Sequence, residues 1–272
     1  MMRGSDTNFT ASVATLYERH LVPLLFTPYA IDLAERLRAP DGGAILEIAA
    51  GTGAVTRIIA ERQPETASII ATDINEGMLA VASEKVRKAN VTFQHSDAMH
   101  LPFGDVTFDA VVCQFGVMFF PDKIAAYREV RRVLKAGGSF LFNSWDEIAK
   151  NGVCVDAAQI AHQVLQTDEP TFLERGPFGY SDPERIVQDL RRAGFVDVAF
   201  QTVSKSGRSQ SGRDAATGLF QGSPVRVEIE ARGEGVMNDC IELMAAAIEK
   251  RYGKGPFETP LSAHVFTAKK EA

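Results

Sequence analysis

Cysteine is scarce in this chain, and its placement excludes two kinds of scaffold. The 272 residues include three cysteines, Cys113, Cys154 and Cys240, which lie far apart and form no CxxC pair. An odd, scattered set does not suit a disulfide framework, and zinc sites need closely spaced ligands. We therefore expect no disulfide and no metal site, and a reducing, cytoplasmic environment.

Long hydrophobic runs and an excess of positive charge are also missing. The most apolar stretches, residues 21–31 and 110–120, are too short to span a bilayer, and residues 1–6 lack the apolar core of a signal peptide. The net charge is −6, from 29 basic and 35 acidic residues. Because nucleic-acid binding depends on clustered Lys and Arg, we expect no nucleic-acid partner and no membrane insertion. A homodimer is possible, and the sequence does not decide the oligomeric state.

What the chain does contain is a regular alternation of short apolar runs with helical patterns. This alternation predicts parallel strands joined by right-handed crossovers, and hence a layered α/β sheet. The first run, residues 44–49, is apolar apart from Glu47, as expected for a strand that helices cover on both faces. The predicted strands are residues 44–49, 68–73, 91–96, 108–114, 139–145, 195–203 and 262–268, with helices at 54–62, 76–89 and 122–135.

Helical patterns also precede and follow this alternation. Residues 9–38 show helical spacing, and Pro23 is expected to start a second helix there. Gly137-Gly138 is expected to end the helix at 122–135 in a left-handed cap. Residues 204–224, rich in Gly, Ser and Arg, are expected to form a mobile loop with a short helix. Further helices are predicted at 151–166, at 183–194 after the N-cap Asp182, and at 236–252.

Chemistry-bearing residues follow the first four predicted strands. The turn Gly51-Thr52-Gly53 has glycines that let the backbone approach a ligand and adopt positive φ. Asp73, 20 residues after Gly53, ends the second strand, where a carboxylate can accept hydrogen bonds from both ribose hydroxyls. Asp97 follows the third strand and can accept from an exocyclic amine, and Gln114 ends the fourth. A tight turn or a helix N-cap explains each feature singly, but together they favour a nucleoside-binding site.

These segments resemble class I S-adenosylmethionine-dependent methyltransferases, most closely the small-molecule branch with the ubiquinone and menaquinone biosynthesis enzymes. The resemblance implies a Rossmann-like, doubly wound, mostly parallel seven-stranded sheet with N-terminal helices and an inserted helical cap. We expect one domain over residues 1–272, with 1–40 as a helical lid, 41–146 as the cofactor-binding core, and 147–272 as the substrate cap and last strands. The motifs lie in residues 46–53, 72–74, 96–103, 108–112, 133–138 and 177–184.

The resemblance also implies which residues meet S-adenosyl-L-methionine and the product S-adenosyl-L-homocysteine. Gly51 and Gly53 would accommodate the methionine end, which Gln114 would face. Glu47 would support that loop or reach the amino group through water, and Tyr17 is expected to cover the cofactor from the lid. The expected cofactor-binding residues are Tyr17, Glu47, Ala49, Gly51, Gly53, Asp73, Ile74, Met78, Asp97, Ala98 and Gln114.

At the adenosine end, Asp73 would bind the ribose hydroxyls and Asp97 the adenine amine, with the Ala98 backbone beside it. Ile74 and Met78 would pack near the adenine. The three acids Glu47, Asp73 and Asp97 suit the sulfonium cation of the donor. Ala49 departs from the family pattern, which usually begins with glycine, and its methyl group leaves less room for contact at that position.

Methyl transfer would be an in-line displacement, in which alignment and exclusion of water supply much of the rate. A carbanion equivalent, an amine or an acidic phenol needs no general base as acceptor, whereas an alcohol does. We assign no catalytic residue, because none of the base candidates stands out: His20, His95, His100, His162 and His264. Aromatic residues expected at the acceptor site, or else in the plain core, are Tyr17, Phe26, Tyr29, Phe119, Phe120, Trp145, Phe178 and Tyr180.

Two other functions share these features. An NAD(P)-dependent oxidoreductase would also have a glycine turn and an acid after the second strand, with the fingerprint G-x-G-x-x-G/A. Starting that fingerprint at Ala49 leaves only its first glycine missing, but Glu47 within the first strand and Asp97-Ala98 after the third fit the methyl donor better. A non-catalytic protein that only binds S-adenosylmethionine is the second alternative, and no sequence feature excludes it.

Overall fold

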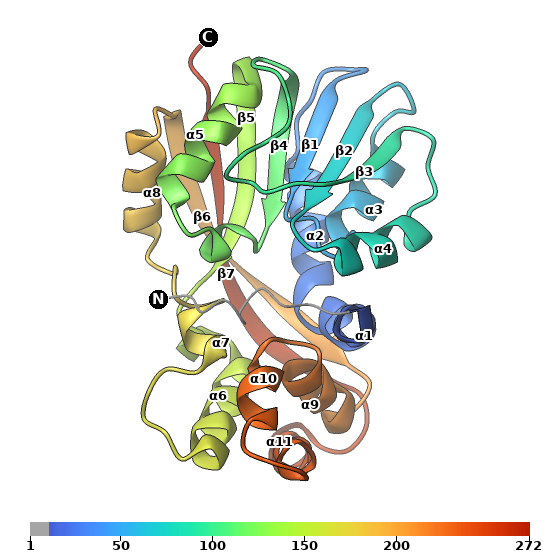
Figure 1. Cartoon of the computed structure of the whole chain (residues 1–272), viewed down its shortest axis with the longest axis vertical. Coiled ribbons are helices and arrows are strands. Elements are labelled where there is room, and N and C mark those ends of the chain that lie inside the picture. The colour runs from blue at the N-terminus through green and yellow to red at the C-terminus, as the bar shows by residue number, and fades with distance from the viewer. Residues whose placement is uncertain (1–10) are drawn as a thin grey trace.

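The computed structural model describes residues 11–272, and the seven strands of this part form one sheet (Figure 1). Residues 1–10, which hold the expected helix start at Phe9 and the segment without the apolar core of a signal peptide, lie outside the described residues. The strand order is β3-β2-β1-β4-β5-β7-β6. The strands are β1 (Ala44–Ile48), β2 (Ser68–Asp73), β3 (Val91–His95), β4 (Phe108–Gln114), β5 (Leu134–Trp145), β6 (Val196–Ser209) and β7 (Phe257–Lys269).

The strands from β1 to β5 are parallel, and β7 runs antiparallel between β5 and β6. Leu46 of β1 lies opposite Ile70 of β2 and Val111 of β4. Phe266 of β7 lies opposite Phe142 of β5 and Phe200 of β6. The predicted α/β, mostly parallel, seven-stranded sheet is therefore confirmed, with two antiparallel pairings at one end, where β7 pairs with β5 and with β6. Because β1, β2 and β4 are parallel, their carboxyl ends meet at one edge of the sheet.

Helices cover both faces of the sheet, as the two sides of β5 reveal. Tyr29 of α2 (Thr27–Arg36) packs edge-on against Trp145, whereas Tyr127 of α5 (Lys123–Val133) packs against Phe140 and Phe142. Odd and even residues of a strand point to opposite faces, so α2 and α5 lie on opposite sides. Beside α2 lies α3 (Ala54–Arg62), and beside α5 lies α8 (Pro183–Arg192); α4 (Glu76–Lys85) packs on β2 and β3.

A helical cap lies beyond the carboxyl ends of the parallel strands, in the lower half of Figure 1. The long strands β6 and β7 continue from the sheet into this cap. The N-terminal π-helix η2 (Tyr17–Phe26), which follows α1 (Ala11–Leu16), contacts both β6 and the cap helix α9. The cap consists of α6 (Gly152–Leu165), α7 (Phe172–Arg175), α9 (Gly212–Gln221), α10 (Val225–Glu230) and α11 (Val236–Tyr252), and short 3-10 helices lie at η3 (Val117–Phe119) and η4 (Ile148–Lys150).

The expected helix start at Pro23 is wrong. Pro23 lies inside η2, and the next α-helix begins at Thr27 with Pro28 in its first turn. Proline has no N–H to donate, which interrupts the α-helical ladder. The wider π-turn accommodates this, and both the N–H and the hydroxyl of Thr27 bond to the Val22 carbonyl.

Further boundaries also differ from the sequence prediction: α4 ends at Lys85 rather than at residue 89, and β7 begins at Phe257 rather than at residue 262. The helix α5 ends at Val133 rather than at Gly137-Gly138, because Leu134 is already extended and begins β5; Gly137 has φ +73° within that strand. Residues 204–224 are not a loop: β6 continues to Ser209 because β7 pairs with it along that whole length, and α9 follows. Within residues 11–272, no helix is long and apolar enough to cross a membrane.

Candidate functional site

A cavity of about 350 Å³ lies at the carboxyl ends of β1, β2 and β4. The strand order reverses between β1 and β4, which is the usual ligand position in such sheets, and the volume is typical of small-molecule sites. Nine of the predicted cofactor-binding residues line it: Tyr17, Ala49, Gly51, Asp73, Ile74, Met78, Asp97, Ala98 and Gln114.

Asp73 stands at the centre of this edge. Its Oδ2 accepts the Gly51 N–H and its Oδ1 the Asn75 N–H, both at 2.8 Å. A carboxylate offers about four acceptor positions, more than these backbone donors use, so Asp73 can also accept a hydroxyl from a ligand. Burial raises the pKa of Asp73, although these backbone donors act in the opposite direction. Gly51 has φ +56° and nothing within 4 Å of the position where a Cβ would stand, so the backbone there is open to a ligand.

The residues after β2 and β3 extend this wall. Asn75 caps α4 by accepting the Met78 N–H at 3.0 Å, and it holds Met78 buried at the cavity. Ile74 is 56% exposed and lies at the rim. Asp97 accepts the Met99 N–H at 2.8 Å and keeps its other oxygen 3.6 Å from His100 Nδ1. The predicted acids after β2 and β3 are thus brought together at one cavity.

Gln114, at the end of β4, carries a buried acceptor. Among the described residues, its Oε1 has no hydrogen-bond partner, although the side chain lines the cavity. A buried acceptor without a partner costs about 1–3 kcal/mol. A ligand ammonium group would satisfy it. Asn143 of β5 supports this turn, because its Oδ1 accepts the Phe115 N–H at 2.9 Å.

Glu47 and Gly53 do not line the cavity. Glu47 is buried behind the turn, where its Oε2 accepts the Thr56 hydroxyl at 2.6 Å. Burial, aided by the charge of Asp73, raises the pKa of Glu47 to about 8. Gly53 has φ +80°, and a Cβ there would lie 3.1 Å from the Ala82 Cβ of α4. Its lack of a side chain therefore serves packing between the turn and α4.

Ala49 shows how this chain manages without the glycine of the family pattern. Its φ is +53°, in the left-handed region that glycine adopts more easily. The facing residue is Gly116, where a Cβ would stand 2.5 Å from the Ala49 Cβ. The family pattern leaves space at the position of Ala49 by placing a glycine there. In this chain the glycine at position 116 leaves the space for the Ala49 methyl group. Sequence reasoning missed Gly116, because the contact joins two loops far apart in the chain.

The N-terminal segment walls the cavity through η2. Tyr17 stacks on Phe26, with ring centroids 5.0 Å apart, and both residues line the cavity. Burial near the Asp73 carboxylate raises the pKa of the Tyr17 phenol, which keeps it neutral. Tyr17, the residue expected to cover the cofactor, therefore lines the cavity.

The rest of the cavity is an apolar chamber between the sheet and the cap. Its floor is a parallel stack of Phe115 on Trp145, with centroids 3.8 Å apart. Of the aromatic candidates, Tyr29 and Tyr180 do not line it: Tyr29 donates to the Val203 carbonyl and Tyr180 to Asp189. The apolar chamber is defined by Leu21, Leu25, Phe26, Phe115, Phe119, Phe120, Trp145, Cys154, Phe172, Leu173, Pro177, Phe178, Leu219 and Pro224.

None of the five histidines of the chain lines this cavity. His95 bonds to the Ile74 carbonyl at 3.0 Å, and His100 is exposed beside Asp97. Within the described range 11–272, no cluster of His, Cys, Asp or Glu is arranged to hold a metal ion. Its three cysteines are all free and buried.

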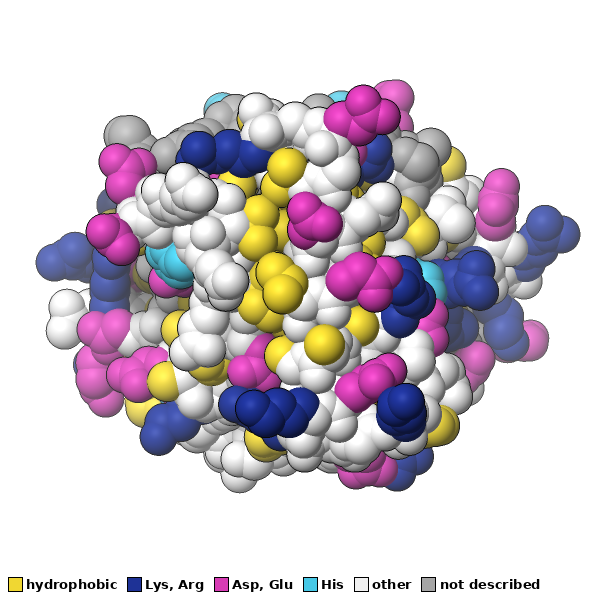
Figure 2. Space-filling model, turned by 90° about the horizontal axis from the view of Figure 1, so that it is seen from below, with side chains coloured by type: hydrophobic (Ala, Val, Ile, Leu, Met, Phe, Trp, Pro, Cys, Tyr) yellow, Lys and Arg dark blue, Asp and Glu magenta, His cyan; other side chains and the backbone are white. Residues whose placement is uncertain are grey.

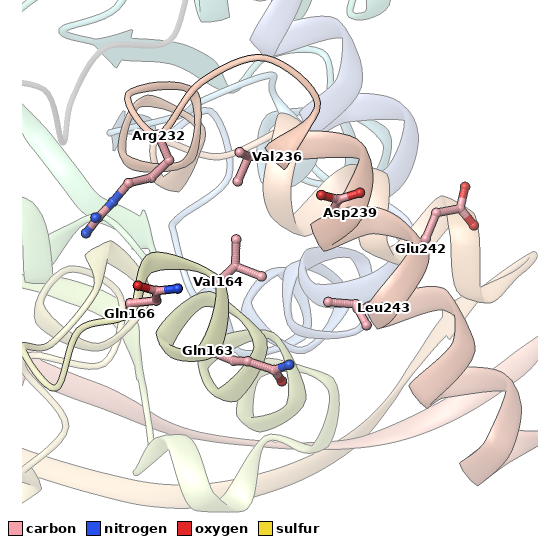
Figure 3. A pocket seen from close by; sticks show the side chains of 8 residues that line it. All are labelled: Gln163, Val164, Gln166, Arg232, Val236, Asp239, Glu242 and Leu243. Atoms are coloured by element: carbon pink, nitrogen blue, oxygen red, sulfur yellow. The ribbon is translucent and has the colours of Figure 1, made fainter.

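A second hollow, of about 660 Å³, lies in the cap between α6 and α11 (Figure 3). It shares no lining residue with the first cavity, and none of the unpartnered buried polar atoms of residues 11–272 belongs to it. The cap face shown in Figure 2 carries a central band of hydrophobic side chains with charged ones around it. The hollow is lined by Gln163, Val164, Gln166, Arg232, Val236, Asp239, Glu242 and Leu243.

Comparison with known proteins agrees with the geometry. Residues 46–142 match the family model described as a methyltransferase domain. The chain is 38% identical over 201 residues to the ubiquinone/menaquinone biosynthesis C-methyltransferase of Idiomarina loihiensis, covering 66% of this chain and 76% of that relative. It is 27% identical over 186 residues to the demethylmenaquinone methyltransferase of Staphylococcus saprophyticus, covering 60% and 75%.

A solved structure shares the fold at low sequence identity. The phosphoethanolamine N-methyltransferase 2 of Haemonchus contortus, crystallised with phosphomonomethylethanolamine and S-adenosylhomocysteine, superposes with a TM-score of 0.63. It is 16% identical and covers 100% of this chain, and the chain covers 61% of it. The relatives favour methyl transfer over both alternatives, the oxidoreductase and the non-catalytic binder. The chain is an enzyme that transfers a methyl group from S-adenosylmethionine to a small molecule, and it belongs to the class I S-adenosylmethionine-dependent methyltransferases, related to the ubiquinone and menaquinone biosynthesis enzymes.

Proposed function

We propose that the cavity holds S-adenosylmethionine at the ends of β1, β2 and β4 and presents its methyl group to an apolar, ring-shaped acceptor. The observation that carries this proposal is the continuity of one cavity. It joins Asp73 and Gln114 to the apolar chamber without an intervening wall. A donor bound at the polar end therefore faces an acceptor at the apolar end.

Different residues at the polar end of the cavity bind different parts of the cofactor. Asp73 binds the ribose hydroxyls through the acceptor capacity that its backbone donors leave, and Asp97 accepts from the adenine amine. The open backbone at Gly51 and the unpartnered Oε1 of Gln114 receive the methionine end. Tyr17 covers the cofactor, whereas Glu47 and Gly53 support the turn from behind.

The bound cofactor supplies an electrophilic methyl group. The residues of the chain align the acceptor with this methyl group and exclude water. The chamber holds the acceptor in line with the methyl group, and its apolar walls exclude water. The chamber has no charged side chain and no histidine, which suits an acceptor that needs no general base. The relatives' names point the same way, because they describe C-methylation and a demethylmenaquinone substrate. We therefore favour an electron-rich quinol ring methylated at carbon.

Methyl transfer from labelled S-adenosylmethionine tests this proposal. The acceptor panel contains a short-chain demethylated quinol, a simple phenol, an apolar amine and phosphoethanolamine. We expect label on the quinol at a rate at least about tenfold above the other acceptors, with the methyl group on a ring carbon by mass spectrometry. Faster transfer to phosphoethanolamine would contradict an apolar acceptor site.

The proposal also covers the roles of the three segments of the chain, its cellular location and its partners. Residues 1–40 serve as lid, 41–146 as cofactor core and 147–272 as substrate cap with the last strands. The free, buried cysteines support a reducing, cytoplasmic location. The acidic balance of the chain supports the absence of a nucleic-acid partner. A homodimer is the remaining expectation, and light scattering on the purified chain decides between one and two copies.

A further inference from the structure

Glu18 on η2 reaches across to the glycine turn after β1. Its Oε2 accepts the Thr52 hydroxyl at 2.6 Å, a short distance typical of a hydrogen bond to a charged acceptor. The Glu18 side chain is 9% exposed, and Thr52 is buried. The bond therefore joins two groups that are largely shielded from water, where a hydrogen bond is stronger than on the surface.

Two cations hold the other oxygen of the same carboxylate. Lys85 Nζ of α4 lies 3.0 Å from Glu18 Oε1, and Arg57 Nη1 of α3 lies 3.8 Å from it. One side chain of η2 thus contacts the turn and the two helices that follow β1 and β2. Nearby charges of opposite sign compensate the carboxylate for its loss of water.

The turn itself is held from two sides. Asp73 accepts the Gly51 N–H from one side, and Glu18 accepts the Thr52 hydroxyl from the other. Tyr17, next to Glu18 in the chain, lines the cavity, as do Leu21 and further residues of η2. A movement of η2 away from the cavity would separate Glu18 from Thr52. The π-helical form of η2 is itself a feature that recurs at functional sites.

We propose that Glu18 is a positioning residue for cofactor binding: its bond to Thr52 latches η2, and with it Tyr17, over the bound cofactor. This inference rests on the proposed function, because it takes the cavity as the cofactor site. The latch acts on the escape of the cofactor. Its signature is therefore a faster release of the cofactor, whereas a looser η2 would also alter the apolar chamber, which Leu21 and Leu25 of η2 line.

The test compares Glu18→Gln and Thr52→Val with the wild-type enzyme. Thr52→Val removes the hydroxyl and keeps the shape, and Glu18→Gln removes the charge that Lys85 and Arg57 compensate. Stopped-flow dissociation of S-adenosylhomocysteine should be about tenfold faster in either variant, as expected for the loss of about one charge-assisted hydrogen bond. In the double variant the two effects on the release rate should be less than additive, because both changes act on the bond between Glu18 and Thr52.

Glu35→Gln is the matched control. Glu35 on α2 also pairs with an α3 residue, Arg62, at 3.2 Å, but this pair is exposed and away from the turn. The control should leave the dissociation rate unchanged. Should Glu18→Gln fail to fold, Thr52→Val decides alone. A wild-type chain that does not bind S-adenosylhomocysteine would overturn the proposed function. A wild-type chain that binds it, with unchanged dissociation in Thr52→Val, would overturn the latch alone.

Discussion

Asp73 and Gly51 are joined by a hydrogen bond of 2.8 Å from the Gly51 N–H to Asp73 Oδ2. This bond ties the end of β2 to the turn after β1. It fixes the orientation of the Asp73 carboxylate, which lines the cavity and can accept further hydrogen bonds. One side chain therefore shapes the turn and offers the acceptor atoms for a ribose.

Replacing Asp73 by Asn should weaken binding of S-adenosylhomocysteine roughly 10- to 100-fold, because an amide lacks the charge and one of the two acceptor oxygens. Titration calorimetry measures this loss. Asp109→Asn is the matched control, since Asp109 also accepts a backbone N–H of β1, that of Ala44 at 2.8 Å, but outside the cavity. Equal losses of affinity in both variants would assign Asp73 a structural role only.

Gly116→Ala should destabilise the fold by about 1–3 kcal/mol, because the new methyl group would overlap the Ala49 Cβ and the Cys113 Sγ. Ala49→Gly should restore part of this loss, since it removes one partner of the clash and relieves a left-handed alanine. A double-mutant cycle of urea unfolding measures the coupling. Strictly additive effects would show that the two residues do not share this space.

The burial of Glu47 predicts a pH dependence of stability. The folded state keeps the Glu47 proton up to a pKa of about 8, whereas the unfolded chain releases it near its ordinary value. Between these values the unfolded state binds fewer protons, so the free energy of unfolding falls as pH rises, by up to about 1.4 kcal/mol per unit. Glu47→Gln removes this contribution. Unfolding at pH 5 and pH 8 should therefore show a flatter dependence in the variant, and identical slopes would refute the prediction.

A larger side chain at Leu173 should obstruct the acceptor and spare the cofactor. Leu173 of α7 is buried and lines the apolar chamber, so Leu173→Trp should raise the acceptor KM at least about tenfold, with overpacking as the physical cause. Affinity for S-adenosylhomocysteine should stay within twofold. The control is Leu243→Trp on α11, which is 42% exposed and lines the second hollow instead. Loss of cofactor affinity in Leu173→Trp would place the cofactor elsewhere in the cavity.

The parts of the site that could be predicted from sequence are those set by local pattern. Apolar runs place the strands, and parallel strands bring their ends to one edge. Gly51, Asp73, Asp97 and Gln114 therefore meet at one cavity, as their positions after successive strands predict. The same reasoning does not decide the role of Gly53, because a left-handed glycine serves close packing as readily as ligand contact, and the choice depends on α4.

The remainder depends on contacts between distant segments. Leu173 and Leu219 reach the chamber from cap helices whose docking no local pattern specifies. The bond between Glu18 and Thr52 spans 34 residues, and the sequence alone offers many other acids for that threonine. The sequence prediction for η2 is wrong at Pro23. The local sequence around a proline does not distinguish a proline in the first turn of an α-helix from a proline inside a π-helix.

The most direct test of the proposed site is a crystal structure of the chain with S-adenosylhomocysteine. The decisive measurement is the distance from each Asp73 carboxylate oxygen to the nearest ribose hydroxyl. We expect both distances at hydrogen-bonding values, about 2.5–3.0 Å, with Tyr17 over the ligand. An adenosyl group bound away from the ends of β1 and β2, or a ribose out of reach of Asp73, would contradict the proposed site.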